Sequence, residues 1–326
     1  MDSTDSVGTI VARIEEEVPS VLAATNTPGA SIALIHDRAC VWTGGFGVTN
    51  SETRKPVKPH NVFEAYSLTK PLLAFRALKM VEDGTLGMDR SLQDYVPTPY
   101  LGPGGEAITL RMVLSHTSGL SDDVEDRAPT SSPGQRWSYS TCGYFYLQHI
   151  IESVSESSIG DNLKANILEP FRMQSSCLTT AEMDTAQLVQ GHRKKGAVAG
   201  NREINLAHAD GLLTTSEDYA QFVVETTIPS NRTTYHLLEA TELDMLRGHV
   251  RLEESIQWGL GWGLQETQEA SYFWHFGGWE DGPFYNFVLG DRDREMGLVV
   301  LTNGGSGEVF EPIVKAVVGD NLPVFP

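Results

Sequence analysis

Hydrophobic positions recur at helical spacing in several stretches of the chain. This spacing places apolar side chains along one face, which is typical of a helix that packs on a core. The pattern in residues 68–83 stops at Gly84, a residue type that commonly ends helices. Helices are predicted over residues 7–22, 68–83, 110–115, 144–155, 159–167 and 309–318.

Short apolar runs bounded by turn residues lie near both ends of the chain and predict strands. Residues 30–36 and 41–46 are separated by Asp37 and Arg38, which predicts a strand pair with a tight turn. Near the C-terminus, comparable runs occupy residues 272–276, 284–289 and 297–302. Predicted strands therefore enclose a mostly helical middle.

This order of elements indicates an α+β fold. We expect residues 1–86 and 214–326 to build one antiparallel sheet flanked by helices. Residues 87–213 are expected to form an inserted, mostly helical subdomain.

Charge restricts the partners of the protein. The chain carries a formal net charge of −19, from 43 acidic and 24 basic side chains. This charge repels phosphate backbones and anionic lipids, so we expect neither a nucleic acid nor a membrane partner. Residues 1–6 lack the basic and then apolar order of a secretory signal, and no apolar run is long enough to span a bilayer. We therefore expect a cytoplasmic location.

The sequence gives no pattern for a cofactor. Cys40, Cys142 and Cys177 show no C-x-x-C spacing, and the nine histidines show no H-E-x-x-H pattern. The glycines in residues 44–47 lack the spacing of a dinucleotide fingerprint. We expect reduced thiols and no metal, nucleotide or other cofactor.

Ser67 and Lys70 lie three residues apart where a helix is predicted to begin, so they share a face. A lysine held in an apolar pocket loses hydration, and its neutral amine can then take the serine proton. Ser67 is therefore a candidate nucleophile and Lys70 its base. The alternative is a helix-capping serine beside a solvated lysine, because S-x-x-K alone is a weak pattern.

Two other stretches carry candidate chemistry. Tyr139 follows a Pro-Gly turn, where a phenol beside a cation can relay a proton; the alternative is a packed structural tyrosine. His275 precedes Gly277 and Gly278 at a predicted strand end, where glycines let a substrate approach the backbone. It can orient or charge-stabilise a bound carbonyl or carboxylate, or it is an ordinary strand-end histidine.

Aromatic residues near these three stretches indicate an apolar-walled cleft for a small molecule, unless they belong to the core. They are Tyr66, Trp137, Phe276, Trp279 and Phe284. His116 and Ser118 are not expected to form a second catalytic pair, because residues two apart do not face each other on a helix or turn.

The order of S-x-x-K, then Tyr139, then H-x-G-G resembles the serine β-lactamase and penicillin-binding family. The resemblance is strongest to class C β-lactamases, D-alanyl-D-alanine carboxypeptidases, family VIII esterases and lovastatin-type acyltransferases. It implies a β-lactamase-like fold over nearly the whole chain. Flanking stretches that also resemble the family are residues 28–33, 114–120, 211–215, 259–262 and 301–304.

By this resemblance Ser67 is acylated, Lys70 serves as its base or relay, and Tyr139 activates Ser67 and then the incoming water or alcohol. The third family motif falls on His275-Phe276-Gly277. An oxyanion hole would come from the backbone N–H of Ser67 and of Gly277 or Gly278. We expect the substrate to be bound by Tyr66, Thr141, Phe276, Gly277, Gly278 and Trp279.

Three positions depart from the family pattern. Thr141 stands where relatives usually have an asparagine, and its hydroxyl offers one donor in place of two. His275 stands where most relatives have a lysine, which weakens the expected grip on a carboxylate. Both departures argue against an efficient β-lactamase. Asp210 replaces a usually small residue, and we interpret it as an exposed loop group, with contact to a cationic substrate as the alternative.

Three hypotheses follow. The first is a serine hydrolase or biosynthetic acyltransferase that acts on a small-molecule ester or amide, with water, an alcohol or an amine as acceptor. The second keeps the cleft but uses Lys70 and Tyr139 for isomerisation, elimination or cyclisation without an acyl-enzyme. The third is a non-catalytic binding protein.

Overall fold

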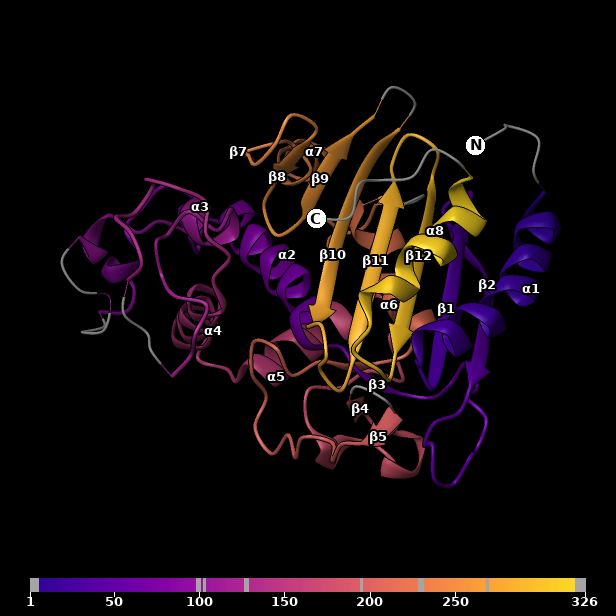
Figure 1. Ribbon diagram of the computed structural model, residues 1–326. Coiled ribbons are helices and arrows are strands. Elements are labelled where there is room, and N and C mark those ends of the chain that lie inside the picture. The colour runs from indigo at the N-terminus through magenta and orange to yellow at the C-terminus, as the bar shows by residue number, and fades with distance from the viewer. Residues whose placement is uncertain are drawn as a thin grey trace.

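The computed structural model describes residues 6–97, 101, 104–125, 129–193, 196–227, 232–267 and 270–319. Residues 1–5, on which the absence of a secretory signal was judged, lie outside this range. The main sheet has the strand order β2-β1-β12-β11-β10-β9-β8-β7, and its pairs are antiparallel. The expected sheet from both chain ends is therefore confirmed (Figure 1).

The strands of the main sheet are β1 Gly29–His36, β2 Ala39–Gly47, β7 Val250–Arg251, β8 Ile256–Trp258, β9 Gly263–Glu266, β10 Ser271–Gly278, β11 Tyr285–Asp291 and β12 Met296–Thr302. Two short pairs lie outside it: β3 Phe63–Glu64 with β6 Leu213–Thr214, and β4 His192–Arg193 with β5 Ala197–Val198. The helices are α1 Val7–Thr25, α2 Thr69–Glu82, α3 Leu110–Leu114, α4 Thr141–Ser155, α5 Ile159–Leu163, α6 Ser216–Thr227, α7 Glu239–Met245 and α8 Phe310–Val318.

The turn between β1 and β2 follows from its two residues. Asp37 and Arg38 both have positive φ values, 49° and 61°. Two successive left-handed residues form the kind of turn whose twist matches that of paired antiparallel strands. The predicted strand pair with a tight turn is thus confirmed.

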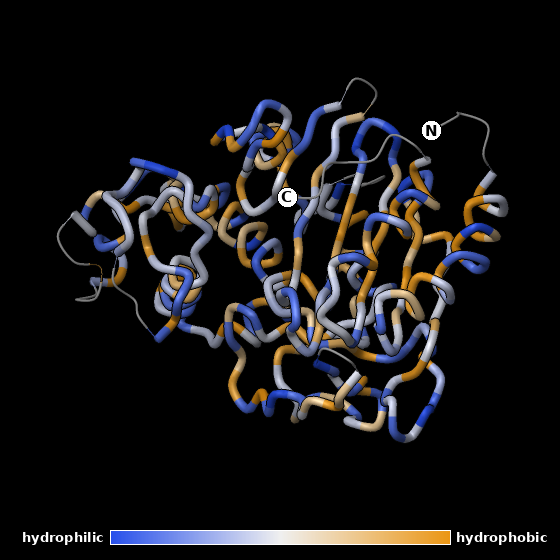
Figure 2. The backbone as a smooth tube through the Cα atoms, in the orientation of Figure 1, coloured by the Kyte–Doolittle hydropathy of each residue, from blue (hydrophilic) through white to orange (hydrophobic). Residues whose placement is uncertain are grey.

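Both faces of the sheet are covered, which explains why its inner strands are apolar throughout. Along β1, Ile32 and Leu34 belong to one buried cluster, with residues of α1 and α8. Ala33 and Ile35 point the other way, into a cluster with residues of α2 and α6. In Figure 2 long hydrophobic stretches run through the central strands, and many of the hydrophilic stretches lie in loops.

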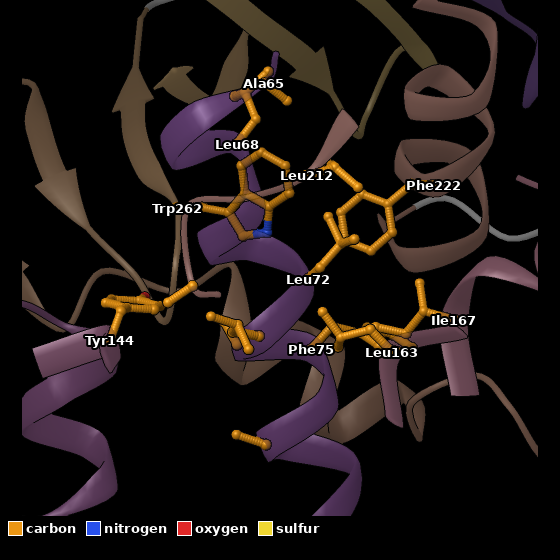
Figure 3. Packing of buried hydrophobic residues seen from close by; sticks show 14 of the residues in the cluster. Ala65, Leu68, Leu72, Phe75, Tyr144, Leu163, Ile167, Leu212, Phe222 and Trp262 are labelled. Atoms are coloured by element: carbon orange, nitrogen blue, oxygen red, sulfur yellow. The ribbon is translucent and has the colours of Figure 1, made fainter. Parts of the chain in front are cut away.

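Helix α2 is buried on most of its surface and so holds its first turn in a fixed place. Leu72 is fully buried, and Phe75 packs edge-on against Phe222 at 6.3 Å between ring centroids. Figure 3 shows Leu72 and Phe75 among buried side chains from several other elements, including Trp262 and Leu212. Burying side chains of this size contributes about 1.5–3 kcal/mol each.

The structure differs from the predicted elements at several points. Helix α4 begins at Thr141, three residues before the predicted start, because the Ser140 hydroxyl accepts a hydrogen bond from Gly143 N and caps the helix. Helices α6 and α7 and strands β7–β9 were not predicted. The boundaries between the sheet and helical subdomains stay a prediction. No helix in the described part of the chain is both long and apolar enough to cross a membrane.

Candidate active site

Ser67 lies in a single 3₁₀ turn, Tyr66–Leu68, that leads directly into α2. Tyr66 has a φ of 52°, a left-handed conformation that is strained for a bulky residue. Hydrogen bonds hold the turn: Thr69 Oγ1 donates to Tyr66 O at 2.6 Å, and the Tyr219 hydroxyl donates to Leu68 O at 2.8 Å. The backbone around Ser67 is therefore positioned by the first residue of α2 and by a tyrosine of α6.

Lys70 faces Ser67, as the three-residue spacing predicted. Its side chain is fully buried, and Nζ donates to Ser67 Oγ at 2.8 Å. Ser67 itself is partly exposed. An amine at this distance is placed to accept the proton of the hydroxyl when the oxygen attacks a carbonyl.

Thr141 connects Lys70 to a carboxylate that the sequence did not single out. Lys70 Nζ donates to Thr141 Oγ1 at 3.3 Å, and Thr141 Oγ1 donates to Asp122 Oδ1 at 2.6 Å. The same carboxylate oxygen accepts from Thr141 N at 3.0 Å. Thr141 thus contacts the catalytic candidate Lys70 from the first turn of α4.

Tyr139 approaches the same lysine with its ring. Lys70 Nζ lies 4.9 Å from the ring centroid of Tyr139, and His116 stacks on that ring at 4.3 Å. Burial lowers the pKa of His116 well below its usual value, so its ring is neutral. The relay role of the Tyr139 hydroxyl stays a prediction.

His275 lies on β10 and is buried, with 1% of its surface exposed. Burial, assisted by the charge of Lys70, lowers its pKa to about 3, so the ring is neutral near pH 7. The expectation that His275 charge-stabilises a carboxylate is therefore wrong, because the desolvated site disfavours the imidazolium. Its Nδ1 donates to Phe276 O at 2.7 Å, and an orienting role stays a prediction.

Gly277 and Gly278, which follow on β10, lie in different surroundings. A Cβ on Gly277 would lie 2.1 Å from Ala65 O, so only glycine lets β10 pack against the turn that carries Ser67. Gly277 is not among the residues that line the cavity at Ser67, whereas Gly278 is. Of the two expected oxyanion-hole candidates, Gly278 is the one that faces the cavity.

Ser67 opens onto a cavity of about 810 Å³. Such a volume suits a small organic molecule. Its lining residues are Tyr66, Ser67, Asp122, Trp137, Tyr139, Thr141, Asp210, Arg251, Leu252, Glu253, Ile256, Trp258, Trp274, His275, Phe276, Gly278 and Trp279. Four of the five aromatic residues expected at a cleft are among them; Phe284 is instead fully buried and packs on Phe63.

Asp210 is not the exposed loop group that we expected. Its side chain is 23% exposed and lines the cavity. His208 Nδ1 donates to Oδ1 at 2.5 Å and Arg202 Nη1 donates to Oδ2 at 3.1 Å. Burial alone would raise the pKa of Asp210, but these two partners outweigh it and lower the pKa to about 2. Sequence reasoning missed Arg202 and His208 because a long loop carries them.

Ser118 lies apart from this chemistry, since it is buried and does not line the cavity. His116 is buried behind Tyr139, where its Nδ1 accepts from Ser140 N at 3.0 Å. Among the described residues no group of three histidine, cysteine, aspartate or glutamate side chains could hold a metal ion.

Comparisons with known proteins find relatives that match most of this chain. Protein flp of Staphylococcus aureus (strain MW2) is 23% identical over 302 residues, which are 85% of this chain but only 59% of that protein. Penicillin-binding protein 4* of Bacillus subtilis (strain 168) is 26% identical over 313 residues, covering 83% of this chain and 67% of that protein. The chain thus spans about three fifths to two thirds of the length of these curated relatives.

A solved structure shows the same fold. EstCE1, described as a hydrolase with promiscuous acyltransferase activity, matches with a TM-score of 0.81 over 96% of this chain and 99% of that chain, at 18% identity. A family model described as Beta-lactamase matches residues 12–319. With nearly the whole chain matched and the S-x-x-K pair in contact, this protein belongs to the beta-lactamase family.

Proposed function

We propose that the protein is a serine-dependent acyl-transfer enzyme that acts on a small-molecule ester or amide through an acyl-enzyme on Ser67. One observation carries the proposal: Lys70 Nζ lies 2.8 Å from Ser67 Oγ at the wall of an 810 Å³ cavity. A hydroxyl next to a buried amine and open to a ligand-sized space is the arrangement that nucleophilic catalysis needs.

The reaction runs in two halves. Ser67 Oγ attacks the carbonyl carbon, its proton passes to Lys70 or Tyr139, and the departing alcohol or amine takes a proton as the carbonyl re-forms. Water or a second alcohol or amine then attacks the acyl-enzyme and releases Ser67. Backbone N–H groups of Ser67 and Gly278 are the proposed donors to the negative oxygen of each tetrahedral intermediate.

Hydrolysis and transfer differ only in the acceptor of the second half. The neutral His275 supports an ester or amide without the carboxylate of a β-lactam or cell-wall peptide, because no imidazolium is present to pair with it. The similarity to a hydrolase with promiscuous acyltransferase activity is compatible with either acceptor. A biosynthetic acyltransferase and an esterase therefore remain two forms of one proposal.

The experiment is intact-protein mass spectrometry after mixing with a chromogenic short-chain ester, with wild type and Ser67→Ala compared. We expect the mass of one acyl group on the wild type, none on Ser67→Ala, and loss of ester turnover in the variant. Adding an alcohol acceptor separates transfer from hydrolysis through the product.

Other results would favour the other hypotheses. Turnover of a metabolite by wild type and Ser67→Ala alike, without an adduct, would indicate acid/base chemistry by Lys70 and Tyr139. Ligand binding that is unchanged in Ser67→Ala, with no turnover of any ester or amide, would indicate a binding protein.

A further inference from the structure

The charges around the cavity are unevenly divided. Among the described lining residues Asp122, Asp210 and Glu253 are acidic, and Arg251 is basic. Arg251 is exposed, and its guanidinium donates to the backbone oxygen of Glu254 at 3.3 Å. Lys70 is engaged with Ser67 and Thr141. A ligand in this cavity therefore meets more carboxylates than free cations.

Asp210 is ionised near pH 7, because its partners lower its pKa to about 2. Arg202 Nε donates to Glu64 Oε2 at 2.8 Å and Arg202 Nη1 donates to Asp210 at 3.1 Å, so one guanidinium serves two carboxylates. Counted over Arg202, Glu64 and Asp210, one guanidinium therefore faces two carboxylates. A carboxylate offers about four lone-pair positions, so the bonds from His208 and Arg202 leave room for a ligand donor.

An exposed tryptophan lies next to this cluster. Trp279 is 54% exposed and stands edge-on to Tyr66, with ring centroids 5.3 Å apart. The guanidinium of Arg202 lies 3.9 Å from the centroid of the same Tyr66 ring. Tyr66 therefore connects the Asp210 cluster to the free indole at the cavity. An aromatic face beside a carboxylate is the combination that binds ammonium groups.

We propose that the substrate carries a cationic group, a protonated amine or a quaternary ammonium, that binds between Asp210 and Trp279 while the reacting carbonyl lies at Ser67. This inference rests on the proposed acyl transfer and names its substrate class. An anionic group in the same place would be repelled by the Asp210 carboxylate. The net charge of −19 further attracts cationic substrates to the protein.

The test uses three 4-nitrophenyl esters whose acyl groups have matched length: 4-(trimethylammonio)butanoate, its neutral carbon analogue 5,5-dimethylhexanoate, and the anionic monoester of glutarate. With wild type we expect kcat/KM for the cationic ester to exceed that for the neutral ester by about tenfold, and the anionic ester to be slowest. The preference should shrink as salt is added, because ions screen the charge of Asp210.

Two variants test whether Asp210 and Trp279 cause the preference for the cationic ester. In Asp210→Asn and in Trp279→Leu we expect the ratio of the cationic to the neutral ester to fall severalfold, and the ratio corrects for any general loss of activity. Glu16→Gln removes a carboxylate on the exposed face of α1 and should leave the ratio unchanged. Equal rates for the three esters in wild type, or a ratio unaffected by Asp210→Asn, would overturn the inference.

A binding measurement separates this inference from the proposed function. Ser67→Ala protein, which forms no acyl-enzyme, is titrated with choline and with the neutral analogue 3,3-dimethylbutan-1-ol, with tryptophan fluorescence as the signal. Tighter binding of choline that weakens in Ser67→Ala/Asp210→Asn supports the cationic site even if no ester is turned over. Ester turnover without charge preference, and equal binding of the two alcohols, would leave the acyl transfer standing and exclude the cationic site.

Discussion

The hydroxyl of Thr141 donates to Asp122 Oδ1 at 2.6 Å, and the same hydroxyl oxygen accepts from Lys70 Nζ at 3.3 Å. Asp122 therefore orients the threonine hydrogen away from the lysine, which leaves an oxygen lone pair to accept from Lys70 Nζ. A single hydroxyl, backed by a carboxylate, takes the place of the asparagine that the family resemblance led us to expect.

The hydroxyl of Thr141 is the first group to test. Thr141→Val removes one of the two acceptors of Lys70 Nζ and the hydrogen bond to the Asp122 carboxylate, and hydrogen bonds to charged groups are worth about 1.5–3 kcal/mol. We expect acylation of Ser67 to slow by about 10–100-fold in single-turnover experiments with a chromogenic ester. Thr141→Ser keeps the hydroxyl and should stay within about threefold of wild type. Equal rates for the valine and serine variants would contradict the role of the hydroxyl.

Asp122 should matter through its charge as well as its oxygen. Asp122→Asn keeps an acceptor for the Thr141 hydroxyl but removes the carboxylate, so we expect acylation to slow by about tenfold, less than in Thr141→Val. Asp293→Asn, an exposed carboxylate outside the cavity at Ser67, is the matched control. The measured quantity is the rate of acyl-enzyme formation. An unchanged rate in Asp122→Asn would contradict a role for the contact between Asp122 and Thr141 in acylation.

Gly277 should tolerate no side chain. In Gly277→Ala the new Cβ would lie 2.1 Å from Ala65 O, which is backbone two residues before Ser67 and has little freedom to move. We expect a loss of about 1–3 kcal/mol in the free energy of unfolding and a drop in kcat as the Ser67 turn shifts. Gly200→Ala, where a Cβ meets open space, should change stability by less than about 0.5 kcal/mol in urea unfolding.

The neutral state of His275 predicts how stability depends on pH. Its pKa is lowered to about 3 in the folded protein from 6.5, so below pH 6.5 the unfolded chain binds a proton that the folded chain excludes. The free energy of unfolding must therefore fall as the pH falls through this window, by about 2–3 kcal/mol at pH 4.5 from His275 alone. This cost reaches its limit near pH 3.

The variant His275→Gln isolates that contribution. Glutamine does not titrate, so the difference in unfolding free energy between the variant and wild type should change with pH by the stated amount. Urea unfolding at several pH values between 4.5 and 8 measures it. Parallel curves for the two proteins would show that His275 titrates normally in the folded state.

Local geometry explains which parts of the site the sequence could predict. The contact between Ser67 and Lys70 depends only on the three-residue spacing at the start of a helix, and the structure has it. Glycines at 277 and 278 indicated a close approach to β10, although only the structure separates the residue that packs on Ala65 from the one that faces the cavity.

The remaining features depend on contacts between distant segments. Asp122 meets Thr141 only because the chain before α4 folds back on that helix, and no pattern of spacing reports this. Asp210 was interpreted as exposed because its partners, Arg202 and His208, are not visible as partners in the sequence. The neutral state of His275 could not be predicted because its burial depends on aromatic neighbours such as Trp258, at 5.8 Å between ring centroids.

The place of β12 in the sheet also constrains how the protein is made. Strand β1 lies between β2 and β12, and its register with β12 pairs Ala30 with Thr302. During synthesis one long apolar edge of the N-terminal hairpin therefore stays unpaired until residues 296–302 have left the ribosome. Chains that stop before residue 296 lack β12 and cannot complete the sheet. The unpaired edge of β1 makes such chains candidates for chaperone binding or aggregation.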